Sequence, residues 1–301
     1  MMAFARVAIV GLGLIGSSIA RAIGERLPQV IVTGHDASDT VRATARNLGL
    51  CNAIADDPVA AVADADLVIL AVPVGRMADA AAAITPGLKA AAIISDVGSS
   101  KAGVAEALAR VLPHHVVIPA HPVAGTENSG PAAGFATLFD GRWCIVTPGP
   151  DAPADAVKAV SDFWEALGAK VDIMDAAHHD MVLAVTSHLP HLIAYTIVGT
   201  ASELEEVTES EVIKYSAGGF RDFTRIAASD PVMWRDVFLA NKDAVLATLQ
   251  RFNEDLTVLQ QAIRRGDADK LEDWFTRTRA IRRSIIAEGQ DDAAPDFGRK
   301  H

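Results

Sequence analysis

Three glycines near the start of the chain have the spacing of a dinucleotide-binding loop. Gly11, Gly13 and Gly16 form a G-x-G-x-x-G pattern between an apolar run and a helical pattern. Glycine at these positions allows a tight turn, close approach of the backbone to a pyrophosphate, and close packing of helix on strand. The start of the helix also attracts phosphate through its exposed N–H groups. The expected cofactor-binding residues of this loop are Gly11, Leu12, Gly13, Leu14, Ile15 and Gly16.

A carboxylate follows the second apolar run at a spacing that suits a ribose. Asp36 lies 20 residues after Gly16, where an acidic residue can accept hydrogen bonds from both ribose hydroxyls of NAD. The same charge would repel the 2′-phosphate of NADP, and Ala37 and Ser38 rather than an arginine follow it. The pattern favours NAD over NADP as the cofactor, and a glycine turn without a ligand is the alternative.

Turn-forming and polar residues also follow two later apolar runs. Val72 and Pro73 end one of them, and Asp96 and Ser99 follow the next. Because open α/β sheets bind ligands outside the carboxyl ends of their strands, we expect Val72, Pro73 and Asp96 to contact the cofactor. Turn and helix-cap roles explain Asp96 and Ser99 equally well.

Three histidines lie in settings that could support catalysis. His121 follows an apolar strand, whereas His188 and His191 are three residues apart and share one face of an expected helix. A metal pair is conceivable, but no cysteine or carboxylate completes a recognisable ligand set, so no metal site is predicted. Buried, hydrogen-bonded histidines are the structural alternative. Asp180 lies about three helical turns before His191 and could face the same cleft, and His35 is expected at the surface.

A basic run in the second half of the chain suggests an anionic ligand. Residues 214–235 carry a local charge of +2, whereas residues 151–301 together carry −9. Guanidinium groups bind carboxylates through paired hydrogen bonds, so Arg225 is a candidate for binding a carboxylated small molecule. Salt bridges to neighbouring acidic residues are the better explanation for Arg221 and Arg235.

The hydrophobic pattern shows which elements must position these residues. Short apolar runs alternate with helical patterns through the first 120 residues, which predicts parallel βαβ units with helices on both faces of a sheet. The expected strands are 6–10, 30–33, 67–71, 92–95 and 116–118. The expected helices between them are 14–26, 40–48, 75–84 and 101–111. Two more expected strands, 143–147 and 170–174, flank a helix at 153–167.

The pattern changes after about residue 175. Only helical periodicity follows, at 177–200, at 231–250 continuing to 265, and at 267–288, with Asp267 as the expected cap of the last helix. The predicted fold class is an α/β N-terminal Rossmann-type domain with a mostly parallel sheet, followed by an all-α C-terminal domain. The expected divisions are 1–175 for the NAD-binding domain, 176–290 for the helical domain, and 291–301 for a polar tail.

Composition excludes several classes of protein. The 301 residues carry a net charge of −11, and an acidic surface argues against binding to nucleic acid or to an anionic membrane. The chain has two cysteines, Cys51 and Cys144, which cannot form a disulfide framework and fit a reducing compartment. The N-terminus has neither the pattern of a signal peptide nor that of a membrane span, so we expect a cytoplasmic protein.

Taken together, the motifs resemble one enzyme family. The motifs are G-L-G-L-I-G-S, D-V-G-S-S-K, H-P-V-A-G-T-E, S-H-L-P-H and G-G-F-R-D-F-T-R-I-A-A-S-D-P-V-M-W-R-D. Their order and spacing resemble the prephenate/arogenate (cyclohexadienyl) dehydrogenase family of tyrosine biosynthesis over roughly residues 5–285. The resemblance implies a Rossmann domain, an all-helical domain that forms a homodimer, and an active site in the cleft between them. It also implies NAD(P)⁺-dependent oxidative decarboxylation of prephenate to 4-hydroxyphenylpyruvate, or of arogenate to tyrosine.

The resemblance also assigns roles to residues. His121 matches the family's catalytic histidine, and Ser99 matches the serine that hydrogen-bonds the substrate hydroxyl and orients that histidine. Arg225 matches the arginine that binds a substrate carboxylate. The residues expected on the substrate side are Arg225, His191, His188, Glu127, Thr126 and Gly218. The segment at 216–219 departs from the longer glycine run of many relatives, which bears on specificity rather than on the type of reaction.

Two other functions remain open at this point. A β-hydroxyacid-type dehydrogenase has the same nucleotide fold, but it is expected to use a lysine on the first helix of the second domain as its acid/base. Residues 177–200 contain no lysine. A non-enzymatic, NAD-binding dimer would need no positioned histidine or arginine. The sequence leaves open the choice between prephenate and arogenate, in which Asp222 could favour an ammonium group, as well as feedback by tyrosine.

Overall fold

The computed structural model describes residues 4–126, 128–203 and 218–287. Glu127 and the polar tail expected at 291–301 therefore lie outside the described residues. The chain divides into two compact units, Met1–Val245 and Leu246–His301. The first unit holds the sheets, the glycine loop and every candidate site residue that is described.

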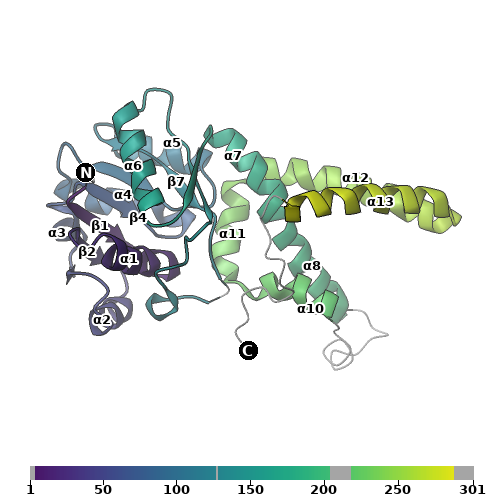
Figure 1. Ribbon diagram of the computed structural model, residues 1–301, viewed down its shortest axis with the longest axis horizontal. Helices are drawn as coiled ribbons and strands as arrows, with labels where there is room; N and C mark the ends of the chain where they lie inside the picture. Colours follow the sequence, from purple (N-terminus) through teal and green to yellow (C-terminus); the bar gives the residue numbers. More distant parts are fainter. Residues whose placement is uncertain (1–3, 127, 204–217, 288–301) are drawn as a thin grey trace. The chain divides into compact units, whose positions relative to one another are not determined.

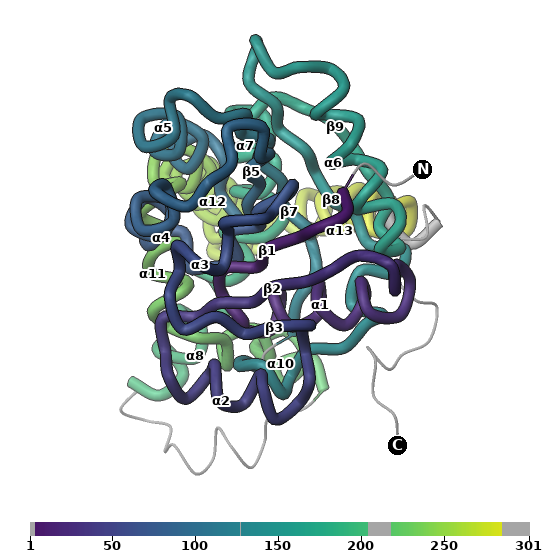
Figure 2. Tube along the Cα trace, turned by 90° about the vertical axis from the view of Figure 1, so that its left-hand side faces the viewer, coloured from purple at the N-terminus to yellow at the C-terminus, as the bar shows by residue number. Residues whose placement is uncertain are grey.

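Six parallel strands form the larger sheet, in the order β3-β2-β1-β4-β5-β6. Figure 2 shows β1, β2 and β3 side by side. The strand order reverses between β1 and β4, which pair with each other, and the crevice at such a reversal is where doubly wound sheets bind ligands. The strands are β1 Arg6–Val10, β2 Ile31–His35, β3 Ala53–Ile54, β4 Leu67–Leu70, β5 Ile93–Asp96 and β6 Val116–Val117. The expected parallel sheet is confirmed, and only the two-residue strand β3 was not predicted.

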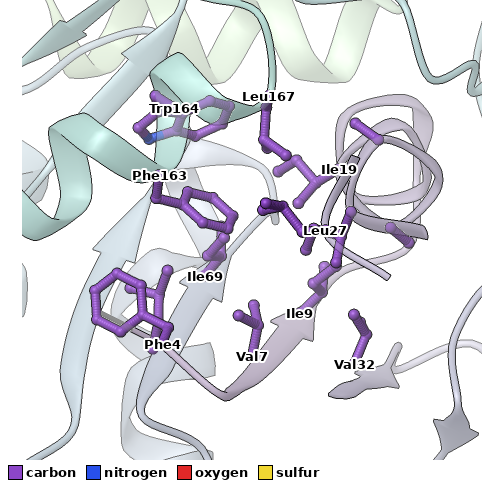
Figure 3. Close-up of a cluster of buried hydrophobic side chains, with 14 of the residues drawn as sticks. Phe4, Val7, Ile9, Ile19, Leu27, Val32, Ile69, Phe163, Trp164 and Leu167 are labelled. Atoms are coloured by element: carbon purple, nitrogen blue, oxygen red, sulfur yellow. The ribbon is translucent and has the colours of Figure 1, made fainter. Parts of the chain in front are cut away.

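Both faces of this sheet are covered, because successive side chains of a strand point to opposite faces. In β1, Val7 and Ile9 join one buried cluster, whereas Ala8 and Val10 join another. Figure 3 shows the first cluster, in which Phe163 and Trp164 lie on the same side of β1 as Ile19. The covering helices are α1 Leu14–Arg26, α2 Asp39–Asn47, α3 Pro58–Val62, α4 Met77–Ile84, α5 Ala102–Val111 and α6 Ala154–Ala166 (Figure 1).

A smaller sheet of three strands carries the first candidate histidine. Its order is β7-β8-β9, with β7 antiparallel to β8 and β8 parallel to β9. The strands are β7 Ala120–Pro122, β8 Trp143–Val146 and β9 Lys170–Ile173. Periodicity did not reveal β7, because three residues ending in proline are too few to show an alternating pattern. His121 thus lies on a strand rather than after one.

The rest of the described chain is helical, as expected, but two boundaries differ from the prediction. The expected helix at 177–200 contains a π-helical turn that ends two residues before Pro190, which cannot donate a backbone hydrogen bond. The expected helix from 231 is interrupted at Asn241, whose buried side chain bonds elsewhere. The elements are α7 Ala176–Leu183, the π turn Ala184–His188, α8 Leu189–Glu203, α10 Gly218–Thr224, the 3₁₀ turn Arg225–Ala228, α11 Pro231–Ala240, α12 Lys242–Arg265 and α13 Ala268–Ala287.

The second compact unit consists of most of α12 and all of α13. Asp267 accepts a hydrogen bond from the backbone N–H of Lys270 at 3.1 Å, so its expected role as a helix cap is confirmed. Large apolar side chains on these helices are between 47% and 67% exposed. They are Leu246, Leu256, Ile263, Phe275 and Ile281.

One helical stretch, Ala176–Glu203, is long and apolar enough to cross a membrane by length and composition alone. Core helices of globular proteins pass the same test. The stretch places the side chains of His179, Asp180 and His188 inside the protein, where they contribute to the candidate site.

Candidate active site

The glycine loop lies between β1 and α1, at the end of the central strand. Gly11 has a φ of +100°, in the left-handed region that favours glycine, and a Cβ there would collide with the carbonyl of Ala71. A Cβ at Gly16 would collide with the carbonyl oxygen of Gly11. By contrast, the space beside Gly13 is open to 4 Å. The loop therefore packs tightly on the protein side and leaves room at Gly13, as a bound pyrophosphate requires.

Asp36 lies directly beside this loop. One carboxylate oxygen accepts the N–H of Leu12 and the other accepts the N–H of Ser38, each at 2.9 Å. These bonds fix the carboxylate while leaving lone pairs on both oxygens for ribose hydroxyls. The nearest arginine, Arg42, donates to the backbone carbonyl of Asp36 at 2.6 Å.

Arg42 is held by acidic side chains rather than presented to a phosphate. Its guanidinium forms ion pairs with Asp39 and with Asp56, the latter at 3.0 Å. Because its charge is matched within the protein, Arg42 offers little compensation for a 2′-phosphate placed next to Asp36. This arrangement favours NAD, as the sequence predicted.

The ends of β4 and β5 complete the same edge of the sheet. Val72 lies against Gly11, within about 3.1 Å of where a Cβ would stand, and Pro73 follows it. In the next strand, Asp96 is fully buried and accepts the N–H of Gly98 at 2.7 Å. The residues expected to bind the cofactor thus come from the ends of four strands, β1, β2, β4 and β5, at one edge of the sheet.

A buried lysine links this edge to the small sheet. Lys101 is fully buried, and its ammonium forms an ion pair with Asp96 and donates to the carbonyl of Ala120 at 2.8 Å. Burial acts to lower the pKa of Lys101, against the raising effect of the Asp96 carboxylate. Since Ala120 directly precedes His121, the lysine fixes the strand that carries the candidate base. Lys101 belongs to the motif D-V-G-S-S-K, but nothing in the sequence indicates this role.

His121 is 7% exposed. Burial lowers its pKa well below the usual value of a histidine, and the nearby His179, Lys101 and His188 add to this effect. The imidazole is therefore neutral at physiological pH, the form that can accept a proton. Its Nδ1 lies 2.8 Å from Nε2 of His179.

Asp180 connects the helical part of the site to the nucleotide-binding part. Its two carboxylate oxygens accept the N–H groups of Lys101 and Ala102, at 2.7 and 2.9 Å, where α5 begins. Nδ1 of His179 also contacts this carboxylate, at 2.8 Å. Asp180 was expected near the cleft, whereas His179 was not predicted, because a pair of adjacent histidines gives no sign of which one faces inward.

His188, in the π turn, is fully buried. The side-chain amide of Asn241 lies 3.1 Å from its Nδ1 and donates to the backbone carbonyl of Asp180 at 2.7 Å. Burial lowers the pKa of His188 to about 4, against the raising effect of Asp180, and the backbone of Ser99 also lies close to the ring. Its Nε2 is buried and meets no hydrogen-bond partner within the described residues, although the nearby backbone of Ser99 acts to raise the pKa of the ring.

An aromatic pair extends the site along α8 and α11. His191 stacks on Trp234 with ring centroids 3.6 Å apart, and burial lowers the pKa of His191 while Arg225 acts in the same direction. The indole N–H of Trp234 is buried without a hydrogen bond in the described part of the chain. Trp234 was quoted in a motif, but the sequence gave no sign that it would lie against a histidine 43 positions earlier.

The remaining predicted residues that the structure describes are exposed. Arg225 begins the 3₁₀ turn that packs against α8, and it is exposed. Thr126 is exposed and accepts the N–H of Asn128, while Gly218 is exposed at the start of α10. Glu127 lies outside the described residues.

Two further features are the position of His35 and the residues that could bind a metal. His35 was expected at the surface, but it is 6% exposed and its Nδ1 lies 3.0 Å from the carbonyl of Ala55; it closes the end of β2 against β3. No cluster of three or more His, Cys, Asp or Glu that could hold a metal occurs within residues 4–126, 128–203 and 218–287.

Two family models together match most of this chain. Residues 19–173 match the nucleotide-binding domain of prephenate dehydrogenase, and residues 175–277 match the dimerization domain of prephenate dehydrogenase. The matched residues include strands β2 to β9, the π turn, and both helices of the aromatic pair, whereas β1 and the glycine loop precede them.

Individual relatives agree with these models. The chain is 47% identical to cyclohexadienyl dehydrogenase of Zymomonas mobilis, over 95% of this chain and 97% of the relative. It is 34% identical to prephenate dehydrogenase of Bacillus subtilis, over 97% of this chain and 78% of the relative. Its structure resembles that of Aquifex aeolicus prephenate dehydrogenase in complex with hydroxyphenyl propionate and NAD⁺, with a TM-score of 0.87 and 33% identity over 95% of this chain and 98% of that one.

Proposed function

The chain belongs to the prephenate dehydrogenase family, and from this membership and the geometry of the cleft we propose that it oxidatively decarboxylates prephenate, arogenate or both, with NAD as the oxidant. The products would be 4-hydroxyphenylpyruvate from prephenate and tyrosine from arogenate. The observation that carries the proposal is a neutral, buried His121 held beside the crevice of a dinucleotide-binding fold.

The reaction needs a proton acceptor in a dry site. When bound, the nicotinamide supplies the acceptor for the hydride that leaves C4 of the substrate ring. His121 takes the hydroxyl proton as that carbon becomes a carbonyl. Loss of CO₂ from C1 then leaves an aromatic ring with a phenolate oxygen, to which the proton returns. Burial of His121 keeps it neutral before the reaction, and in our assignment Ser99 would orient the hydroxyl group.

We assign the other candidate residues by position. The cofactor would be held by residues 11–16, Asp36, Val72, Pro73 and Asp96, which surround the crevice. Arg225 would bind the side-chain carboxylate of the substrate, next to His191. His188 offers its unpartnered Nε2 to the ligand, and Thr126, Glu127 and Gly218 would line the outer part of the substrate pocket.

At the scale of the chain, we propose a division at 175/176 into an NAD-binding domain and a helical substrate and dimerisation domain. The large apolar side chains exposed on α12 and α13 support a homodimer through the helical domain, because covering them would remove apolar surface from water. A cytoplasmic location is supported by two free cysteines, Cys51 and Cys144.

One assay tests the proposed reaction against its alternatives. NADH absorbance is followed with prephenate, arogenate and a 3-hydroxy acid as separate substrates. We expect turnover with prephenate, arogenate or both, and none with the 3-hydroxy acid. Turnover with the 3-hydroxy acid alone would identify a β-hydroxyacid-type enzyme, and absence of turnover with all three would leave an NAD-binding dimer. A parallel titration with NAD⁺ and NADP⁺ tests Asp36, because tighter binding of NADP⁺ would refute its assigned role.

A further inference from the structure

A chain of three side chains runs from His121 into the helical part of the protein. Nδ1 of His121 lies 2.8 Å from Nε2 of His179, and Nδ1 of His179 lies 2.8 Å from a carboxylate oxygen of Asp180. All three residues are buried, at 7%, 0% and 5% exposed. In such a chain each hydrogen bond restricts the direction of the next.

The carboxylate of Asp180 determines the direction of the first hydrogen bond in this series of side chains. Both oxygens of Asp180 accept backbone N–H groups at the beginning of α5, and hydrogen bonds of this kind favour the ionised form. These bonds and the contact with His179 lower the pKa of Asp180, although burial opposes them. An ionised carboxylate can only accept hydrogen bonds. Nδ1 of His179 must therefore carry a hydrogen and donate it.

The direction of the second bond follows from the first. In the arrangement in which both imidazoles are uncharged, each ring has one N–H, so with Nδ1 protonated, Nε2 of His179 has a free lone pair and accepts. Nδ1 of His121 must then be the donor. This leaves Nε2 of His121 without a hydrogen, and that nitrogen is the one able to take a proton from a substrate.

We propose that His179 is a positioning residue that sets the tautomer of the catalytic base, so that Nε2 of His121 is the proton acceptor. The inference rests on the proposed function for the identity of the base, but the tautomer itself does not depend on any substrate. His179 touches neither cofactor nor substrate in this assignment. It acts through His121 by orienting the ring and by accepting its Nδ1–H throughout the reaction.

Other ionisable groups near His121 do not supply this contact. His188 lies on the π turn, Lys101 on the loop before α5, and Cys144 on the neighbouring strand β8. Lys101 has only donors, and these are directed to Asp96 and to Ala120. The thiol of Cys144 forms a hydrogen bond with the backbone of His121 rather than with its imidazole. The described contact of the imidazole Nδ1 is with His179 alone.

The direct test is ¹⁵N NMR of the histidine side chains in the full-length protein without substrate. The signal of His121 is assigned by its loss in His121→Gln. We expect the wild-type ring to show a protonated Nδ1 and an unprotonated Nε2 at pH 7. The opposite tautomer would overturn the proposal whatever the enzymatic activity is. A correct tautomer with an inactive protein would instead count against the proposed function.

Kinetics of two variants provide the second test. His179→Phe keeps a ring of similar size but removes the acceptor, and we expect kcat to fall about 10²-fold, as for a misplaced catalytic group, with KM changed less than about twofold. His179→Gln can still accept from Nδ1 through its amide oxygen, and we expect it to recover part of that loss. His178→Phe places the same substitution at the exposed neighbouring position and should behave as wild type. An unchanged kcat in His179→Phe would overturn the proposal, and if that variant does not fold, the Gln variant and the wild-type spectrum still decide it.

Discussion

At the scale of single residues, the site depends on side chains whose burial determines their protonation. His121 and His188 are both neutral because water is excluded from them. The sequence identified both of them, because each belongs to a recognisable motif. It did not identify Lys101 or His179 as site residues, because their roles depend on contacts across 19 and 58 positions of the chain. Long-range pairing of this kind leaves no periodic trace in the sequence.

The first prediction concerns the base. His121→Asn removes the proton acceptor while keeping a polar side chain, so kcat should fall by roughly 10²–10⁴-fold, the range for loss of a general base. Turnover is measured from NADH absorbance under saturating substrate, and thermal melting checks that the variant is folded. Near-normal turnover in a folded variant would show that another group accepts the proton.

The second prediction concerns the substrate carboxylate. Arg225→Gln should raise KM more than it lowers kcat, because a contact made equally in the ground state and the transition state affects binding. Arg221→Gln is the matched control, since Arg221 lies on the adjacent helix α10 with its guanidinium 3.7 Å from Asp222. An unchanged KM in the Arg225 variant would indicate a structural role for that side chain.

The third prediction concerns acid stability. Folding holds the pKa of His188 at about 4, below its usual value of 6.5, so the unfolded chain binds more protons than the folded one between these values. The contribution of this residue to the free energy of unfolding should therefore be fully present above pH 6.5. It should decrease by about 3 kcal/mol as the pH falls toward 4. Denaturant unfolding at pH 7 and pH 4.5 measures the effect. The decrease should be smaller in His188→Gln than in the exposed control His178→Gln, and equal decreases would contradict the assignment.

At the scale of elements, most strands and helices were predictable from the sequence, whereas the interruptions within the helices were not. The strands β1, β4 and β5 and the helix α1 were predicted to within a residue or two, because apolar runs and a glycine loop delimit them. The π turn and the break at Asn241 were missed, because both interrupt helices whose apolar pattern continues across them. The interruptions place His188 and Asn241 in contact with each other, and no local propensity encodes that contact.

The fourth prediction concerns Lys101, whose ammonium group contacts a strand of each sheet. Lys101→Met removes the cation that joins the end of β5 to β7 and leaves Asp96 buried without its partner. The free energy of unfolding should fall by about 3–5 kcal/mol, as when one member of a buried ion pair is removed. Lys158→Met is the control, because Lys158 forms an exposed pair with Asp162 of little energetic value. Equal stability of the two variants in denaturant would contradict this role.

At the scale of the whole molecule, the exposed apolar side chains of the second unit lead to the fifth prediction. Ile263→Glu places a charge where a residue is 67% exposed in the single chain and, in our proposal, becomes covered by a second copy. The variant should be monomeric in sedimentation at a concentration where wild type is dimeric. Arg264→Glu changes the charge at the next position and is the control. A dimeric Ile263 variant would place the interface elsewhere.

The carboxylate of Asp180 has a consequence for movement. It belongs to α7 and accepts the first N–H groups of α5, so α7 is joined to the start of a helix that packs on the larger sheet. We expect this junction to act as the pivot of any opening of the proposed cleft. Displacements should then be smallest at His121 and His179 and grow along α8 toward α10. Substrate would enter and leave at that distant end while the proposed proton acceptor keeps its alignment.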